Sequence, residues 1–391
     1  MKRIYLDYNA TTPLRDEVRD VMVEDFAIFA NASSMHGSGR EARERIEEAR
    51  IRVAELLGVP AKTIIFTSGG SESNNTVFGT MRRLASNEQG TPLDSGRRVF
   101  LVSAIEHPCV LNSAKYLESL GFSVVFLPVD STGRINMDEL KKALSEETLL
   151  VSVMMANNEI GTIQDIKEIA ALARARGAFI HSDAVQAAGK IPVNAGELGV
   201  DYLSLSAHKI YGPKGVGALY IKEKAPLFPL IHGGHHEEGL RAGTYNNSGI
   251  LGFGKAAELA KRGLSEYNKA MITLRNKLKQ GLLEKIPNIR INGHETEVLP
   301  NTLNVSFSGA EGEAILLSLD LAGIEVSTGS ACASGSLEPS HVLLASGAGP
   351  ELAHGSIRFS LGLGTSEEDI DYVLEKTPPV IARLRSMSTL E

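Results

Sequence analysis

The sequence is poor in cysteine, in excess basic charge and in long apolar runs. Its 391 residues include two cysteines, Cys109 and Cys332, so a disulfide framework is not indicated and a reducing cytoplasm fits. No segment has the apolar length of a membrane helix, and an acidic residue, Asp7, precedes any apolar stretch where a secretory signal would need one. A formal net charge of -7 without a Lys/Arg cluster gives no basic face for nucleic acid. We therefore expect a cytoplasmic protein that binds neither membranes nor nucleic acid.

The composition, with 43% hydrophobic and 22% charged residues, is that of an ordinary globular protein. More than one core is expected, because a single hydrophobic core stops growing at about 250–300 residues. Short apolar, β-branched runs alternate with amphipathic helical stretches from about residue 63 to 221, which predicts an α/β domain with a mostly parallel sheet. Its seven expected strands are 63–67, 98–102, 123–127, 148–155, 178–182, 201–206 and 216–221.

A long helical stretch from about residue 250 to 285 is expected to cross from the α/β domain into a second, smaller unit. Strands and helices beyond it predict an α+β domain. Its expected elements are strands 302–307, 324–327 and 356–361, a helix at 311–322 and a helix from 366 onward. We divide the chain into an N-terminal segment, 1–15, that packs on the small domain, a large domain, 16–258, and a small domain, 259–391, that carries Cys332.

Polar residues gather where the expected parallel strands end. Ligands bind beyond the carboxyl ends of the strands in an open α/β sheet, so we expect these side chains to share one site. Lys209 follows one strand, and burial among apolar neighbours would favour the neutral amine that captures an aldehyde. Asp183 follows another strand, where a carboxylate can keep the ring nitrogen of pyridoxal phosphate protonated. A lysine and an acid on one sheet edge predict a pyridoxal-phosphate enzyme.

Two further strand ends carry residues that suit a cofactor site but also suit an ordinary structural role. The run 68–71, Ser-Gly-Gly-Ser, precedes a helix, and its N–H groups suit either a phosphate or a simple turn in which Ser71 caps the helix. There is no lysine at the spacing of a nucleotide triphosphate loop. His107 follows the strand at 98–102 and can stack on a cofactor ring, move protons or be structural. Because the run 68–71 and His107 are expected at the same sheet edge as Lys209 and Asp183, the position of each favours a role in the cofactor site.

The two cysteines differ in their surroundings. Cys332 lies in the run 328–336, which is too small and polar to form core, so we expect an exposed loop with a reactive thiol. Cys109 stands ahead of an apolar helical run and is expected to pack as a small hydrophobic residue. Arg358 lies in an apolar strand and needs a partner, either a substrate carboxylate or a structural ion pair.

Together these residues resemble the cysteine desulfurases, which are fold-type I pyridoxal-phosphate enzymes, along nearly the whole chain. The resemblance is carried by YLDYNATTP (5–13), TSGGSES (67–73), EH (106–107), NNEIG (157–161), DAVQ (183–186), SAHKIYGPKG (206–215), RAGT (241–244), SAC (330–332) and SIRFS (356–360). The loop around Cys332 is similar to that of the long-loop group, which includes nitrogenase-type members. One departure is Pro378-Pro379, expected to interrupt the terminal helix because prolines inside a helix break or kink it.

The resemblance implies a role for each matching residue. Lys209 would form the internal aldimine, Asp183 would pair with the pyridine nitrogen and His107 would stack on the ring. The other implied cofactor contacts are Asn158 and Gln186 near the ring hydroxyl, Gly70, Ser71, Ser206 and His208 at the phosphate, and Thr244 at the phosphate from the neighbouring subunit of a homodimer. Arg358 and Asn31 would hold the substrate carboxylate. No residue is assigned as a metal ligand.

The implied reaction removes sulfur from L-cysteine and releases L-alanine. The freed Lys209 would deprotonate Cα, and the Cys332 thiolate would take the sulfur as a persulfide for an iron–sulfur scaffold or another acceptor protein. Two alternatives on the same fold are a selenocysteine lyase and an aminotransferase, although an aminotransferase needs no loop thiol. An alternative of another class is a non-catalytic platform in a sulfur-transfer assembly, against which the presence of Lys209, Asp183 and Cys332 argues.

Overall fold

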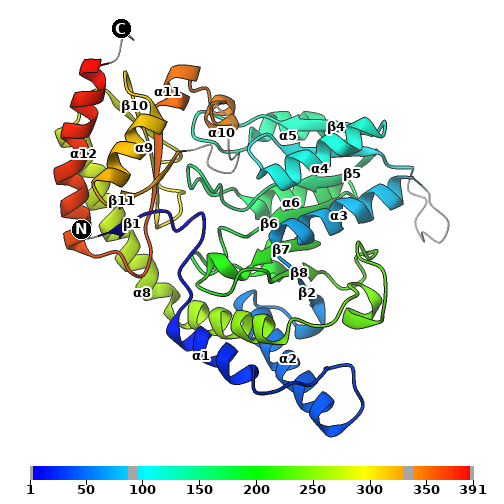
Figure 1. Ribbon diagram of the computed structural model, residues 1–391. Helices are drawn as coiled ribbons and strands as arrows, with labels where there is room; N and C mark the ends of the chain where they lie inside the picture. The colour runs from blue at the N-terminus through cyan, green and yellow to red at the C-terminus, as the bar shows by residue number, and fades with distance from the viewer. Residues whose placement is uncertain (1–2, 87–95, 329–337, 388–391) are drawn as a thin grey trace.

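A seven-stranded sheet forms the centre of the larger part of the protein (Figure 1). The structure is a computed structural model that describes residues 3–86, 96–328 and 338–387. The sheet has the order β2-β8-β7-β6-β5-β3-β4, and its strands are β2 (Ile64–Thr67), β3 (Val99–Ser103), β4 (Ser123–Leu127), β5 (Thr148–Ser152), β6 (Phe179–Asp183), β7 (Tyr202–Ser206) and β8 (Gly217–Ile221). β8 runs antiparallel to β7 and β2, and the other neighbouring pairs are parallel. The predicted α/β fold with a mostly parallel sheet is confirmed.

Helices cover both faces of this sheet, which is why its strands are apolar on both sides. In β3, Phe100 and Val102 face one apolar cluster and Leu101 faces the other. The first cluster is formed with α3 (Gly70–Ala85) and α4 (Pro108–Ser119). The second is formed with α1 (Asp16–Asp25), α2 (Gly37–Leu56), α5 (Met137–Ala143), α6 (Ile166–Ala175), α7 (Ala195–Leu198) and the first half of α8 (Asn247–Lys285).

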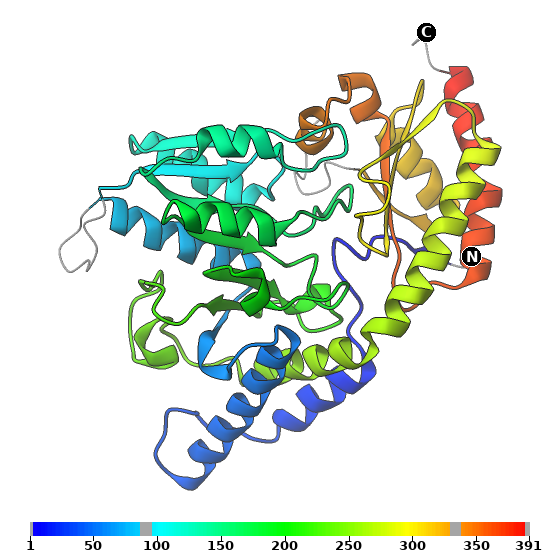
Figure 2. The same cartoon turned by 180° about the vertical axis from the view of Figure 1, so that it is seen from behind.

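Helix α8 connects the two parts of the molecule, as Figure 2 shows from behind. Its first half buries Phe253 and Ala257 in the core of the large sheet, and its second half buries Met271 and Leu278 in a separate core. That second core lies on an antiparallel sheet with the order β12-β13-β10-β9. Helices α10 (His341–Ala345) and α11 (Pro350–His354) pack in a further cluster with Ile105 and Ile160 of the large domain. The other elements of this part of the chain are β9 (Ile289–Asn292), β10 (Thr302–Phe307), α9 (Gly312–Leu321), β12 (Ser327–Thr328), β13 (Ser356–Ser360) and α12 (Glu367–Met387). This is the expected smaller α+β unit.

The N-terminal segment touches both parts of the molecule. Its strand β1 (Ile4–Tyr5) pairs in parallel with β11 (Ile324–Glu325), and Leu6 is buried in the core of the small sheet. Farther on, the Thr12 backbone N–H donates to the His208 carbonyl at 3.0 Å, on the large domain. The residue numbers at which we divided the domains stay predictions. Among the helices of the described ranges, none has the length and hydropathy that crossing a membrane requires.

The prediction that Pro378-Pro379 interrupts the last helix is wrong, because α12 runs through both prolines. Pro378 lacks the N–H that would bond to the Leu374 carbonyl one turn earlier. Lys285, at the end of α8, donates its Nζ to that carbonyl at 3.3 Å. A neighbouring helix therefore supplies the donor that the proline cannot.

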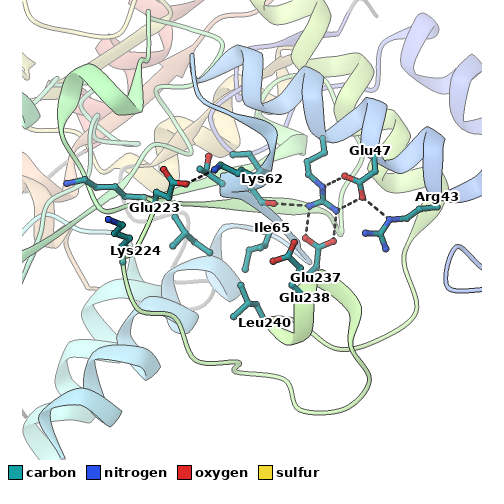
Figure 3. Close-up of a pocket in the computed structure, with 15 residues that line it drawn as sticks. Arg43, Glu47, Lys62, Ile65, Glu223, Lys224, Glu237, Glu238 and Leu240 are labelled. Carbon is teal, nitrogen blue, oxygen red and sulfur yellow. Dashed lines mark hydrogen bonds and ion pairs between the residues drawn. The ribbon is translucent and has the colours of Figure 1, made fainter. Parts of the chain in front are cut away.

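A buried ion pair holds the segment around Glu237 against strand β2 (Figure 3). Arg50, on α2, donates Nη1 to Glu237 Oε2 at 2.6 Å and Nη2 to Glu237 Oε1 at 2.8 Å. The Phe66 backbone N–H also donates to Glu237 Oε2, at 2.9 Å. Glu237 has a φ of 48°, a left-handed backbone that a non-glycine residue keeps only when its surroundings hold it there. The ion pair therefore fixes a strained turn at the edge of the large sheet.

We expect Glu237→Gln to lower the free energy of unfolding by about 3 kcal/mol, because breaking a buried ion pair leaves a guanidinium charge poorly compensated inside the protein. Arg50, Glu237, Lys62 and Glu223 line one cavity, and the control is Glu223→Gln, which breaks the exposed ion pair between Glu223 and Lys62 there (Figure 3). Exposed pairs contribute about 0–1 kcal/mol. Urea unfolding followed by circular dichroism measures both losses. Equal losses in the two variants would contradict the anchoring role of Glu237.

Candidate active site

Side chains from several strand ends meet in one cavity of about 270 Å³. The cavity lies beyond the carboxyl ends of parallel strands, where a doubly wound sheet binds ligands. The predicted site residues that line it are Gly70 and Ser71 after β2, His107 after β3, Asn158 after β5, Asp183 and Gln186 from β6, and Ser206, His208 and Lys209 from β7. The N-terminal segment adds Asn9 and Ala10. The topology therefore brings together residues that lie far apart in the sequence.

Lys209 is held at the cavity wall by the N-terminal segment. It ends the short helix Ala207–Lys209 that follows β7, and its side chain is half-buried. Its Nζ donates to the Asn9 carbonyl at 2.6 Å and to the Ala10 carbonyl at 2.7 Å. Two backbone carbonyls thus orient the amine in the cavity wall.

Asp183 is the last residue of β6 and is 5% exposed. Its Oδ2 accepts from Asn74 Nδ2 at 2.7 Å, and its Oδ1 accepts from the Val185 backbone N–H at 2.9 Å. These donors fix the direction of the Asp183 side chain. Asn74 has no role in our sequence prediction, although a fully buried asparagine inside an amphipathic helix is the kind of residue that calls for a polar partner.

His107 caps the first turn of α4, and its imidazole ring is buried in the cavity wall in the neutral form. Its Nδ1 accepts from the Cys109 backbone N–H at 3.2 Å, so the remaining proton of a neutral ring lies on Nε2. Burial lowers the pKa of His107, although the negative charge of Asp183 acts against this. A neutral, fixed imidazole in the cavity wall suits stacking on an aromatic ring.

Cys109 packs against the apolar cluster of α3 and α4, as predicted, but it also lines the cavity, which we did not expect. Its Sγ lies 3.0 Å from His107 Nδ1 and 3.2 Å from Asn74 Nδ2. Burial, and then the negative charge of Asp183, raise the pKa of the Cys109 thiol to about 12. The thiol is therefore protonated near neutral pH and is a poor nucleophile.

The start of α3 forms a cradle that fits a phosphate group. The first N–H groups of a helix have no acceptor within the helix and lie at the positive end of its dipole. A Cβ on Gly70 would lie 2.7 Å from Val185 Cγ2, so only glycine fits where the helix approaches the turn after β6. Ser206 and His208 face the same cavity. Burial, with the positive charge of Lys209, lowers the pKa of His208 to about 4, which leaves a neutral ring with one N–H to donate.

Arg358 is 1% exposed and forms an ion pair with Asp7 at 2.7 Å. Its Nη1 donates to the Asn158 carbonyl at 3.0 Å, which places the guanidinium behind the cavity wall. Within the described residues its Nε has no hydrogen-bond partner. Of the two partners we considered, the structure contains the structural ion pair, and a contact with a substrate carboxylate stays a prediction.

Three other predicted site residues are not part of the cavity of this chain. Asn31 is exposed and its Oδ1 accepts from the Ser33 backbone N–H at 2.9 Å. Thr244 is also exposed, and it was predicted to act on a neighbouring subunit. Cys332 lies outside the described residues. The roles of all three stay predictions.

A buried carboxyl group connects the end of β5 to the small domain. Glu159, which follows Asn158, accepts at Oε2 from the Ser340 hydroxyl at 2.5 Å, and Ser340 caps helix α10. Burial raises the pKa of Glu159 from 4.5 to about 7, against the effects of the Ser340 hydrogen bond and the Arg358 charge. Glu159 lies in the NNEIG motif (157–161) of the sequence, but only the structure shows its partner.

We expect Glu159 to make the free energy of unfolding fall as pH rises. A carboxyl group whose pKa is higher in the folded state contributes stability that is complete below the unfolded pKa and is lost as pH rises through about 7. Between about pH 5 and pH 8, wild type should lose roughly 2–3 kcal/mol more than Glu159→Gln. Urea unfolding at several pH values measures this, with the exposed Glu295→Gln as control. Parallel pH profiles for wild type and Glu159→Gln would refute the assignment.

Comparisons with known proteins show similarity along nearly the whole chain. The model of the family described as aminotransferase class-V matches residues 4–373. A protein named cysteine desulfurase IscS from Dictyoglomus turgidum is 50% identical over 390 residues, which are 99% of this chain and 97% of that protein. A protein of the same name from Methanosarcina thermophila is 46% identical over 390 residues, 100% of this chain and 94% of that protein.

Solved structures show the same similarity. A NifS-like protein superposes with a TM-score of 0.90 at 41% identity, and the superposition covers 98% of this chain and 100% of that chain. A NifS-like protein from Rickettsia africae superposes with a TM-score of 0.86 at 33% identity, covering 97% of this chain and 99% of that chain. The predicted resemblance, the fold type and the cofactor class are confirmed. The chain belongs to the class-V aminotransferase family, and within it to the cysteine desulfurases, which are enzymes that depend on pyridoxal phosphate.

Proposed function

We propose that this protein is a cysteine desulfurase that removes sulfur from L-cysteine, releases L-alanine and holds the sulfur as a persulfide on Cys332. The observation that carries the proposal is the cavity in which the amine of Lys209, the carboxylate of Asp183 and the neutral ring of His107 meet. The sulfur is passed to a partner in iron–sulfur cluster assembly or to another acceptor. We also propose a cytoplasmic location, which rests on the sequence prediction.

Each group of the cavity fits one part of the cofactor. Pyridoxal phosphate, when bound, supplies an electron sink for the carbanion that forms at Cα of an amino acid. Asp183, held by Asn74 and Val185, keeps a proton on the ring nitrogen, because its charge stabilises a protonated partner. His107 offers a flat neutral face to the ring. The residues that hold the phosphate are Gly70, Ser71, Ser206 and His208, and those near the ring hydroxyl are Asn158 and Gln186.

Lys209 is the residue that moves the Cα proton. Its amine donates to the Asn9 and Ala10 carbonyls, which places it at the cavity wall. Once free in the cavity it takes the proton from Cα as a general base. Arg358 and Asn31 orient the substrate through its carboxylate in this proposal, and release of Asn158 or Asp7 would free the Arg358 guanidinium for that contact.

Cys332 is the thiol that takes the sulfur. Its thiolate attacks the substrate sulfur, the bond between that sulfur and the substrate carbon breaks, and the carbon keeps the electron pair and is protonated to give alanine. The other cysteine, Cys109, is in the cavity but its pKa of about 12 leaves it protonated. The high pKa of Cys109 supports Cys332 as the nucleophile.

A homodimer completes the proposed site through Thr244 of the neighbouring subunit. Large apolar side chains are exposed on the connection between α1 and α2, where Phe26 is 71%, Phe29 is 102% and Met35 is 90% exposed. Apolar groups clustered on a surface in this way mark interaction sites. Asn31 lies in the same connection, so a second copy that covers it would bring Asn31 to an interface.

The first experiment is a visible spectrum followed by an alanine assay. Purified protein with pyridoxal phosphate should be coloured and, with L-cysteine and a reductant, should release alanine and sulfide in equal amounts. Alanine without sulfide would exclude the desulfurase, and a colourless protein would favour the non-catalytic platform. A strong preference for selenocysteine over cysteine would identify the selenocysteine lyase, and amino-group exchange without sulfide the aminotransferase.

We expect Lys209→Ala to lower the rate of alanine release by at least about a thousandfold, because general acid–base groups contribute up to about four orders of magnitude. The fold should persist, since Lys209 lies at a cavity wall and its bonds to the Asn9 and Ala10 carbonyls are not part of either apolar core. Lys285→Ala, a lysine of the small domain, is the control and should keep its activity. Activity of Lys209→Ala near that of wild type would remove Lys209 from the mechanism.

We expect Cys332→Ser to bind pyridoxal phosphate and L-cysteine but to form no sulfide, because a serine hydroxyl cannot take sulfur as a thiolate does. Cys109→Ser should keep most of its activity and lose about 1 kcal/mol of stability, since it places a hydroxyl in a mostly buried site. Mass spectrometry after brief exposure to L-cysteine without reductant locates the added sulfur. Sulfur on Cys109 with Cys332 unmodified would overturn the assignment.

A further inference from the structure

A buried lysine lies directly behind the wall of the cavity. Lys190 is 3% exposed and follows the turn after β6, and it is not among the residues that line the cavity. Gln186, four residues earlier in the sequence, does line the cavity. A lysine is almost never buried without partners, so its position calls for an explanation. The proposed mechanism assigns it no role.

The partners of Lys190 are two amide oxygens. Its Nζ donates to Gln186 Oε1 at 2.6 Å and to Asn9 Oδ1 at 3.0 Å. Burial, together with the positive charges of Lys209 and Arg358, lowers the pKa of Lys190 well below its usual value. A neutral amine still carries two N–H groups, so both hydrogen bonds persist whether or not Lys190 holds its third proton.

The two bonds of the Gln186 amide determine which end of it faces which neighbour. An amide accepts at its oxygen and donates at its nitrogen, so the oxygen must face the Lys190 amine. Gln186 Nε2 donates to the Asn9 backbone carbonyl at 2.9 Å, and that carbonyl only accepts. Both neighbours require the same orientation. One N–H of Gln186 is left for an acceptor in the cavity.

We propose that Lys190 is a positioning residue that holds Gln186 with its N–H group available to an oxygen of the bound cofactor. The proposal rests on the proposed function, because it assumes that the cavity binds pyridoxal phosphate. Without Lys190 the Gln186 oxygen is buried with no donor, and an unsatisfied amide moves or turns to find one. Lys190 thus acts on the cofactor through Gln186 and without touching it.

The test is a double-mutant cycle on the affinity of the cofactor-free protein for pyridoxal phosphate, measured by titration with visible absorbance. Lys190→Met removes the donor and keeps most of the volume, and Gln186→Leu removes the amide. Each should raise the dissociation constant about tenfold. The double variant should be no weaker than Gln186→Leu alone, because mutations that act through one contact are not additive.

Lys285→Met is the control, since Lys285 also donates to an oxygen but lies in the small domain, and its dissociation constant should equal that of wild type. A Lys190→Met value within twofold of wild type, or an equal loss in the Gln186→Leu background, would overturn the proposal. If Lys190→Met does not fold, Lys190→Leu, which also removes the donor, takes its place with the same criteria. A wild type that does not bind the cofactor would overturn the proposed function as well, so the two failures are distinguishable.

Discussion

The buried side chain of Asn9 is the contact on which the rest of the site depends. Asn9 is 1% exposed, and its backbone carbonyl accepts from Lys209 Nζ and Gln186 Nε2 on the large domain. On the small domain, its Nδ2 donates to Thr302 Oγ1 at 2.8 Å and its Oδ1 accepts from Asn301 Nδ2 at 3.1 Å. A buried polar network is stable only when each member is satisfied, so one residue connects both domains to Lys209, the proposed catalytic residue. The part of the cavity wall that Asn9 forms is therefore held by the small domain as well as by the large one.

Much of the fold could be predicted because its signals are local. The buried strands are short apolar runs that end at polar residues, and β4 and β10 have the predicted bounds. Strand β9 was missed because it is a half-exposed edge strand that contains Arg290, so its pattern is weak. The predicted strand 324–327 is two short strands, β11 and β12, which pair with β1 and β13 respectively. Which partner a strand takes is decided at long range, and a sequence window does not contain that information.

The cavity residues could be predicted for a related reason. Parallel strands align their carboxyl ends at one edge, so a polar residue that follows a strand is placed in the site by topology alone. Residues that act from elsewhere have no such signal. Asn74 lies inside a helix, Lys190 lies beyond a turn, and Ser340 comes from the small domain. Their partners are Asp183, Gln186 and Glu159, and the pairing is visible only after the chain has folded.

The electrostatics of the cavity explain why Cys332 and not Cys109 is the proposed nucleophile. In the proposed mechanism the cofactor's ring nitrogen is paired with a carboxylate, and Asp183 is a buried carboxylate in the cavity wall. The same burial and the same negative charge raise the pKa of a thiol beside it, as they do for Cys109. A cysteine fixed in this wall is thus protonated and unreactive, however close it lies to the ring. A thiolate that is to take sulfur in this site has to come from a residue outside the wall, and Cys332 is the other cysteine of the chain.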